Sequence, residues 1–250
     1  MIRTFKPREA KRINIDRGRY SSHFARGASL VLISIEGIDG SGKGTQAQRL
    51  VDFLSAAGWR AALLGFPRYS ETFFGARIGE FLNGHFGGLD QVSPLLAALL
   101  FAGDRFESRS RLQQLLETHD VVVLDRYVAS NVAHQAAKLD GPDRQQLIAQ
   151  IEQLEFSIYG LPRPDRVLLL DIPAAVSRKL VARKARRDYT AAEADLQEAD
   201  TDYQERVRQL YRDLATGDDS WRTVSVVNEQ GELRGIDDIA AELSGYVDVR

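Results

Sequence analysis

The sequence contains no cysteine and a single methionine, Met1, among its 250 residues. Without thiols the chain has neither a disulfide framework nor a thiolate metal centre, and its four histidines are scattered, which argues against zinc chemistry. No apolar run approaches the roughly 18 residues of a membrane span, and the N-terminus lacks the apolar core of a secretory signal. We therefore expect a cytoplasmic protein with no membrane partner.

Charges of the two signs nearly cancel over the whole chain but are unevenly distributed. Residues 1–28 hold eight Lys or Arg and two acidic residues, whereas the remainder holds 25 basic and 33 acidic residues. The acidic excess after residue 28 argues against a nucleic-acid partner. We interpret residues 1–28 as a disordered basic extension; a transit-like or anion-binding arm and a wrongly assigned start are the alternatives.

Short apolar runs, bounded by turn residues and separated by helical patterns, are typical of buried strands. Five occur, at residues 30–35, 60–64, 121–124, 167–170 and 223–227. Strands that alternate with helices predict an α/β domain over residues 29–250, with a five-stranded parallel sheet and helices on both faces.

Three other segments have a distinct pattern. Apolar spacing predicts a first helix from Gly42 to Ala57, followed by Gly58 as the residue able to adopt positive φ. Pro94 is typical of the first turn of a helix, which we expect to reach Glu117. Residues 183–200 are rich in charge and alanine without an apolar face, which favours a mobile lid or a solvated helix pair.

The strongest local signal follows the first strand and opens the first helix. It comprises Gly37, Ile38, Asp39, Gly40, Ser41, Gly42, Lys43, Gly44 and Thr45. This pattern predicts a P-loop for a nucleoside triphosphate, because glycines let backbone N–H groups surround a phosphate, the helix N-terminus favours negative charge, and Lys43 reaches the β and γ oxygens.

The loop departs from the usual pattern at one position. Gly44 stands where Ser or Thr is expected after the lysine, so no hydroxyl is available there for a metal. The Gly-Lys-Gly-Thr-Gln run resembles adenylate kinases. That resemblance implies that Thr45 contacts a nucleotide phosphate and that Mg²⁺ is held largely through water.

A second group of residues is of the types that bind a nucleotide base. Phe101 and Arg105 are four apart in a helical stretch, so an aromatic ring and a guanidinium leave the same face. Together they are suited to hold a base by stacking and edge hydrogen bonds. A core phenylalanine beside a surface arginine is the simpler alternative.

Asp125 and Arg126 follow the third apolar run, at the edge where open α/β sheets place their ligands. An acid here suits Mg²⁺ and an arginine suits an acceptor phosphate, although an internal pair between these two residues is the alternative. Asn131 and His134 continue the segment on a shared helical face. The amide of Asn131 is suited to a base edge, and a lone histidine is more often structural.

Five motifs occur together and in order, at residues 35–43, 66–69, 100–105, 124–131 and 160–165. In these motifs the chain resembles the thymidylate kinases over essentially all of residues 29–245. The resemblance implies a P-loop nucleoside monophosphate kinase with a mobile lid at about residues 183–200. It also implies a homodimer, to which the predicted helix 94–117 would contribute. The implied reaction transfers the γ-phosphoryl of ATP to dTMP, giving dTDP and ADP.

The resemblance also implies roles for single residues. Phe101 would stack on thymine, Arg105 would bond its carbonyl edge and Asn131 its ring N–H. The implied contacts at the phosphate and sugar come from Arg68, Tyr69, Arg126, His134 and Asp39. Gly40 and Ser41 leave the loop without an arginine, so the catalytic arginine is expected in the lid, at Arg183 or Arg187. Candidate Mg²⁺ ligands are Asp39, Asp125 and Glu198.

His134 is the main departure, because many relatives carry a tyrosine there that packs where a 2′-hydroxyl would fit. Another monophosphate kinase acting on dUMP, UMP or CMP is therefore the first alternative. A P-loop nucleotide switch is the second, although the Asn-Lys-x-Asp guanine signature is missing.

Overall fold

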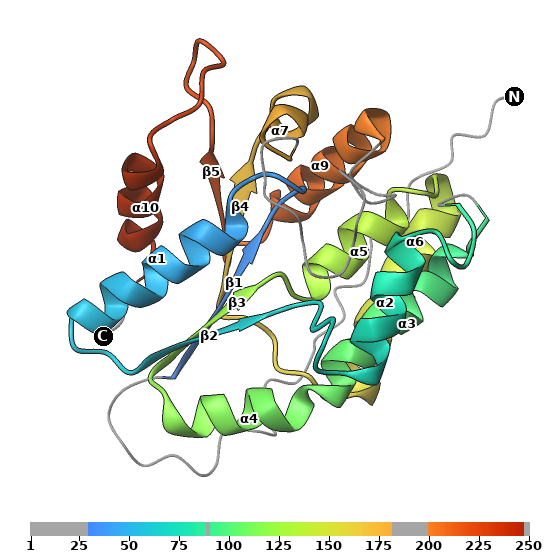
Figure 1. The fold of residues 1–250 in the computed structure, drawn as a ribbon, viewed down its shortest axis with the longest axis horizontal. Coiled ribbons are helices and arrows are strands. Elements are labelled where there is room, and N and C mark those ends of the chain that lie inside the picture. Colours follow the sequence, from blue (N-terminus) through green and yellow to red (C-terminus); the bar gives the residue numbers. More distant parts are fainter. Residues whose placement is uncertain (1–29, 89–90, 182–199, 248–250) are drawn as a thin grey trace, which may run out of the picture.

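The computed structural model describes residues 30–88, 91–181 and 200–247 (Figure 1). Its elements, in chain order, are β1 (Val31–Glu36), α1 (Lys43–Ala56), β2 (Ala61–Gly65), α2 (Phe73–Leu82), α3 (Pro94–Glu107), α4 (Arg109–Thr118), β3 (Val121–Asp125), α5 (Val128–Ala136), α6 (Gly141–Glu152), the π-helix η1 (Gln153–Ile158), β4 (Arg166–Asp171), α7 (Ala174–Val181), α9 (Thr201–Ala215), β5 (Trp221–Ser225) and α10 (Ile236–Gly245). The basic extension and the lid residues Arg183, Arg187 and Glu198 lie outside the described residues.

The strands form one parallel sheet in the order β2-β3-β1-β4-β5. All five predicted strands are present, with bounds shifted by one or two residues. Ile35 of β1 and Gly65 of β2 both pair with Asp125 of β3. The carboxyl ends of these three strands therefore meet at one edge, where the sequence motifs at residues 37–45, 66–69 and 125–127 begin.

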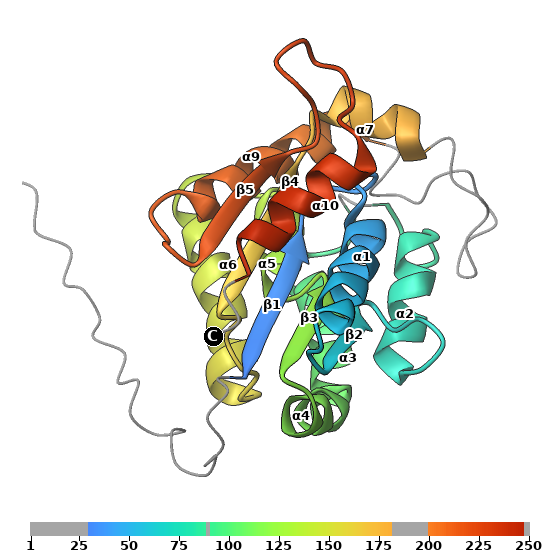
Figure 2. The same cartoon turned by 90° about the vertical axis from the view of Figure 1, so that its left-hand side faces the viewer.

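Helices cover both faces of the sheet, as predicted. Figures 1 and 2 show α1 and α10 on one face and α5 and α9 on the other. Ile33, Val122 and Leu168 in the three central strands are fully buried, as expected for a parallel sheet covered on both sides. A smaller cluster joins Ile78 and Phe81 of α2 to α3.

The single helix predicted for residues 94–117 is wrong. Two helices, α3 and α4, meet at Ser108, whose ψ of −2° departs from helical values and changes the direction of the chain. The Ser108 N–H still donates to Asp104 and its carbonyl accepts from Leu112, while its hydroxyl is 3.1 Å from Nη1 of Arg68. The apolar spacing continues through Ser108, so the pattern gave no signal of this break.

The first helix agrees with its prediction. It begins at Lys43 and ends at Ala56, and Gly58 has φ of +90°. Within the part of the chain that the structure describes, no helix combines the length and the apolar character needed to cross a bilayer.

Candidate active site

The loop between β1 and α1 has a backbone that only glycine adopts readily. Gly42, which precedes the first residue of α1, has φ of +90°. A Cβ atom at Gly37 would lie 2.6 Å from the carbonyl oxygen of Leu170 on β4. The loop is thus fixed between the sheet and the N-terminus of α1, where backbone N–H groups and the helix dipole favour an anion.

Lys43 lies across this loop. Its side chain is buried, and Nζ donates to the carbonyl oxygen of Ile38 at 2.7 Å and to Oγ of Ser41 at 3.4 Å. Gly44 and Thr45 are exposed on the first turn of α1. The ammonium group is therefore held beside the anion-favouring backbone, as the P-loop pattern predicts.

Arg126 follows β3 in a left-handed conformation, with φ of +67°, which is uncommon for a residue with a side chain. Its backbone N–H donates to Ile35 at 3.1 Å. Its guanidinium forms a salt bridge with Asp39 and donates to Oγ of Ser130 at 3.2 Å. The alternative pair between Asp125 and Arg126 is wrong, because among the described residues the ion-pair partner of Arg126 is Asp39.

The electrostatic surroundings keep both members of this pair ionised. Burial by itself raises the pKa of Asp39, but the positive charges of Arg126 and Lys43 outweigh it and lower that pKa below its ordinary value. Burial lowers the pKa of Arg126, yet Asp39 and other nearby groups raise it further. Both groups therefore remain ionised at neutral pH.

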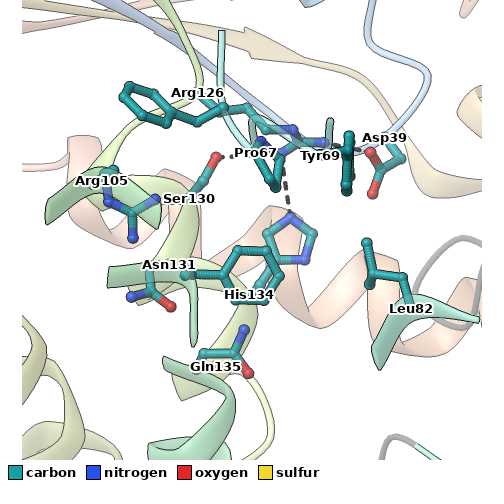
Figure 3. Close-up of a pocket in the computed structure, with 12 residues that line it drawn as sticks. Asp39, Pro67, Tyr69, Leu82, Arg105, Arg126, Ser130, Asn131, His134 and Gln135 are labelled. Carbon is teal, nitrogen blue, oxygen red and sulfur yellow. Dashed lines mark hydrogen bonds and ion pairs between the residues drawn. The ribbon is translucent and has the colours of Figure 1, made fainter. Parts of the chain in front are cut away.

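An open cavity lies next to this pair (Figure 3). Its walls come from Asp39, Phe66, Pro67, Tyr69, Leu82, Phe101, Arg105, Arg126, Ser130, Asn131, His134 and Gln135. Figure 3 shows Arg105 and Asn131 on one side and Asp39 on the opposite side, with the guanidinium of Arg126 reaching toward Asp39. Phe101 and Arg105 thus face the same cavity as the phosphate loop.

Arg105 is only 2% exposed, so the surface-arginine alternative is wrong. Its Nε and Nη2 bind the two carboxylate oxygens of Glu155, with Nη2 2.7 Å from Oε1. Glu155 comes from η1 and is fully buried. Oε1 of Glu155 also accepts from Nδ2 of Asn131 at 2.9 Å. One carboxylate therefore holds both polar residues at this side of the cavity.

Comparison with known proteins agrees with this geometry. The family model described as thymidylate kinase matches residues 35–234. The chain belongs to the thymidylate kinase family. A thymidylate kinase from Mycobacterium tuberculosis is 39% identical over 185 residues, covering 74% of this chain and 86% of that protein. A probable thymidylate kinase from Thermococcus gammatolerans is 34% identical over 224 residues, covering 87% and 96%.

A solved structure also matches the chain and supports the same family. Thymidylate kinase from Candida albicans, described as having broad substrate specificity, matches with a TM-score of 0.66 and 32% identity, covering 87% of this chain and 91% of that one. The predicted family, P-loop kinase fold and enzyme class are confirmed. The chain is accordingly an ATP-dependent kinase that phosphorylates dTMP.

His134 lies in the cavity wall in its neutral form. Burial, and then the nearby charge of Arg126, lower its pKa to about 3. The hydroxyl of Tyr203 on α9 lies 3.3 Å from Nδ1 and donates to the His134 carbonyl at 2.7 Å. His134 therefore presents a neutral ring to the cavity.

The structure places Arg68 away from this set. Arg68 does not line the cavity; its guanidinium binds Glu71 and the Oγ of Ser108. Its backbone N–H donates to Asp104 at 3.0 Å. The contact between Arg68 and the dTMP phosphate stays a prediction, with the Arg68 guanidinium outside the cavity wall, whereas its neighbour Tyr69 does line the cavity.

The sequence analysis missed two residues of this site, Gln135 in the cavity wall and Glu155 behind it. Gln135 is fully buried, its Oε1 accepts from Lys138 at 2.9 Å, and its Nε2 has no partner in the described part of the chain. Its position four residues after Asn131 on one helix was a usable signal. Glu155 had none, because it is 50 residues from Arg105 and stands in an ordinary helical pattern.

Asp125 lies beside the first turn of α1. Its Oδ1 is buried without a hydrogen-bond partner in the described ranges, and a Cβ atom on Gly44 would lie 3.1 Å from Oδ2. Among residues 30–88, 91–181 and 200–247 no group of three acidic or histidine side chains forms a complete metal site. Mg²⁺ in kinases usually needs only one or two carboxylates plus substrate phosphates and water, so this arrangement fits it.

Proposed function

We propose that the cavity binds dTMP with its base beside Arg105 and its phosphate beside Arg126, while residues 37–45 bind the phosphates of ATP. One observation supports this arrangement above all: Asp39 belongs to the phosphate loop, lines the cavity and binds Arg126. The donor and acceptor phosphates would therefore meet at this residue. The sugar 3′-hydroxyl would lie close to the Asp39 carboxylate.

The base end of the cavity offers the groups that thymine requires. The unpartnered Oδ1 of Asn131 suits the ring N–H, and Nη1 of Arg105, which Glu155 does not use, suits a carbonyl oxygen. Phe101 supplies an aromatic face. Nε2 of Gln135 is a further buried donor for a second carbonyl oxygen.

The reaction needs no general base in this proposal. An oxygen of the ionised dTMP phosphate attacks the γ-phosphorus in line, the bond to the bridging oxygen breaks, and ADP leaves with the electron pair. Lys43 and Arg126 stabilise the charge that develops, and Thr45 contacts a phosphate of ATP. We assign the lid to residues 183–200, with Arg183 or Arg187 as the additional cation, and residues 1–28 to a separate extension.

Mg²⁺ is the metal we assign to this site. Asp125, with Asp39, would hold it on the protein side, because Asp125 has a buried oxygen without a partner. When bound it would neutralise charge on the ATP phosphates. Glu198 is a third ligand candidate from the proposed lid.

A homodimer is the assembly that we propose. Leu95, Leu99 and Phe106 of α3 are 40%, 38% and 47% exposed, and their spacing places them on one face of the helix. Leu96, at 59% exposed, lies beside them. An exposed apolar stripe of this kind supports association with a second copy.

A panel of acceptors tests the proposed site. Purified protein is incubated with ATP and Mg²⁺ and with dTMP, dUMP, UMP, CMP or AMP, and ADP formation is measured. We expect dTMP to give the highest kcat/KM and to raise ADP formation well above the rate without acceptor. A clear preference for a ribonucleotide would contradict the assignment of the base end.

A further inference from the structure

The amide of Asn131 has two ends in different surroundings. Nδ2 donates to the carbonyl oxygen of Ala98 at 3.0 Å and to Oε1 of Glu155 at 2.9 Å. Oδ1 is buried and has no partner among the described residues, and Asn131 lines the cavity. Asn131 therefore presents a hydrogen-bond acceptor, Oδ1, to the cavity, while its donor group, Nδ2, is bound by other residues of the protein.

This orientation is locked by the groups around it. A rotation of the amide by half a turn would place Oδ1 against the Ala98 carbonyl and the Glu155 carboxylate, which are both acceptors. Glu155 cannot move aside, because it is fully buried and both its oxygens bind Arg105. Three elements, α3, α5 and η1, thus fix one amide.

Thymine and cytosine present different hydrogen-bonding groups to a residue at this point of the cavity. Thymine presents a ring N–H between two carbonyl oxygens, whereas cytosine presents an unprotonated ring nitrogen beside an amino group. An amide oxygen facing the base accepts from the first and repels the second. The guanidinium of Arg105, a donor only, discriminates in the same direction.

We propose that Glu155 is a specificity-determining positioning residue, which fixes the acceptor end of Asn131 toward the base and thereby excludes cytosine nucleotides. Glu155 does not line the cavity itself. It acts through the orientation of Asn131. The inference rests on the proposed dTMP site, and it adds the residue that sets the hydrogen-bonding polarity of that site.

The test compares dTMP with 5-methyl-dCMP, which carries the same methyl, sugar and phosphate. Glu155→Gln keeps the side-chain shape but removes the charged acceptor that faces Asn131, so only the Ala98 carbonyl still opposes rotation of the Asn131 amide, and orientations with Nδ2 toward the base become populated. We expect the ratio of kcat/KM for dTMP over 5-methyl-dCMP to fall by about tenfold or more, since one buried hydrogen bond changes polarity. A loss of fold or of phosphate binding would lower both substrates together and leave the ratio unchanged.

Two further variants separate this role from a structural one. In an Asn131→Ala background, Glu155→Gln should change the ratio much less, because the group on which it acts is gone. Glu152→Gln makes the same chemical change close by at a half-exposed side chain, 3.8 Å from Arg163, and should leave the ratio as in wild type. An equal change of the ratio with and without Asn131 would overturn the inference.

The outcomes also separate this inference from the proposed function. If wild type fails to phosphorylate dTMP, the proposed site is wrong. If wild type is active and a folded Glu155→Gln protein keeps the wild-type ratio, only the role of Glu155 is wrong. Should Glu155→Gln not fold, Glu155→Asp retains the charge that Arg105 needs and withdraws the oxygen from Asn131, and the ratio should fall in the same direction.

Discussion

Arg126 and Asp39 form a salt bridge across the carboxyl ends of β3 and β1, between residues 87 apart in the sequence. Nε2 of Gln204 on α9 donates to the second oxygen of Asp39 at 3.2 Å. The Asp39 backbone carbonyl accepts from the hydroxyl of Ser177 on α7. The pair therefore connects the phosphate loop to the helices on both sides of residues 182–199 and is the natural first target for mutation.

Asp39→Asn should lower kcat by about 100-fold, because the neutral amide no longer holds the Arg126 guanidinium in one position. Steady-state kinetics with dTMP and ATP measure the effect. Asp52→Asn is the matched control, since Asp52 is exposed on α1 and accepts from Gln48 on the same helix. A kcat of Asp39→Asn within twofold of wild type would contradict the role of the pair.

Two replacements of Arg126 separate the contribution of its charge to catalysis from the effect of its backbone conformation on stability. Arg126→Ala and Arg126→Gly should both lose about 1,000-fold in kcat, in the range found for arginines that stabilise phosphoryl transfer. They should differ in stability: φ of +67° costs alanine about 1 kcal/mol and glycine nearly nothing. Denaturant unfolding should therefore give the higher free energy of unfolding for Arg126→Gly. Equal stability of the two proteins would show that this backbone is not strained.

His134 should make the folded state sensitive to acid. Its folded pKa of about 3 lies below the ordinary value of 6.5, so between these values the unfolded chain binds a proton that the folded chain does not. The free energy of unfolding should fall as pH decreases below 6.5, by up to about 1.4 kcal/mol per pH unit. Unfolding curves from pH 7 to pH 5 should be flatter for His134→Gln than for wild type. His85→Gln, at an exposed histidine, should retain the wild-type slope.

Disruption of the apolar stripe on α3 should abolish the proposed homodimer. Leu95→Glu with Leu99→Glu places two charges among the exposed apolar side chains, and light scattering should show a shift from the mass of two chains to that of one. Leu233→Glu is the matched control, because Leu233 is 44% exposed in the segment between β5 and α10. A monomeric wild type would refute the dimer directly.

The sequence predicted some of these features well and others not at all. The five strands and the start of α1 were found because apolar runs, turn residues and glycines act over a few neighbouring residues. The break at Ser108 was missed, since the apolar spacing runs through it, and its hydroxyl contacts Arg68, which is 40 residues earlier in the sequence. The cavity residues Phe101, Arg105, Asn131 and His134 were found by type and spacing. Gln135 in the cavity wall and Glu155 behind it were not.

By itself the sequence determined the sheet, the phosphate loop and the family, because each depends on a contiguous run whose backbone preferences or residue order are local. Only the tertiary structure decided that Asp39 is the partner of Arg126 and that Glu155 orients Asn131 and Arg105. The physical reason is that a buried charge must be paired, while the choice among 35 acidic residues depends on which one the fold brings within hydrogen-bond distance.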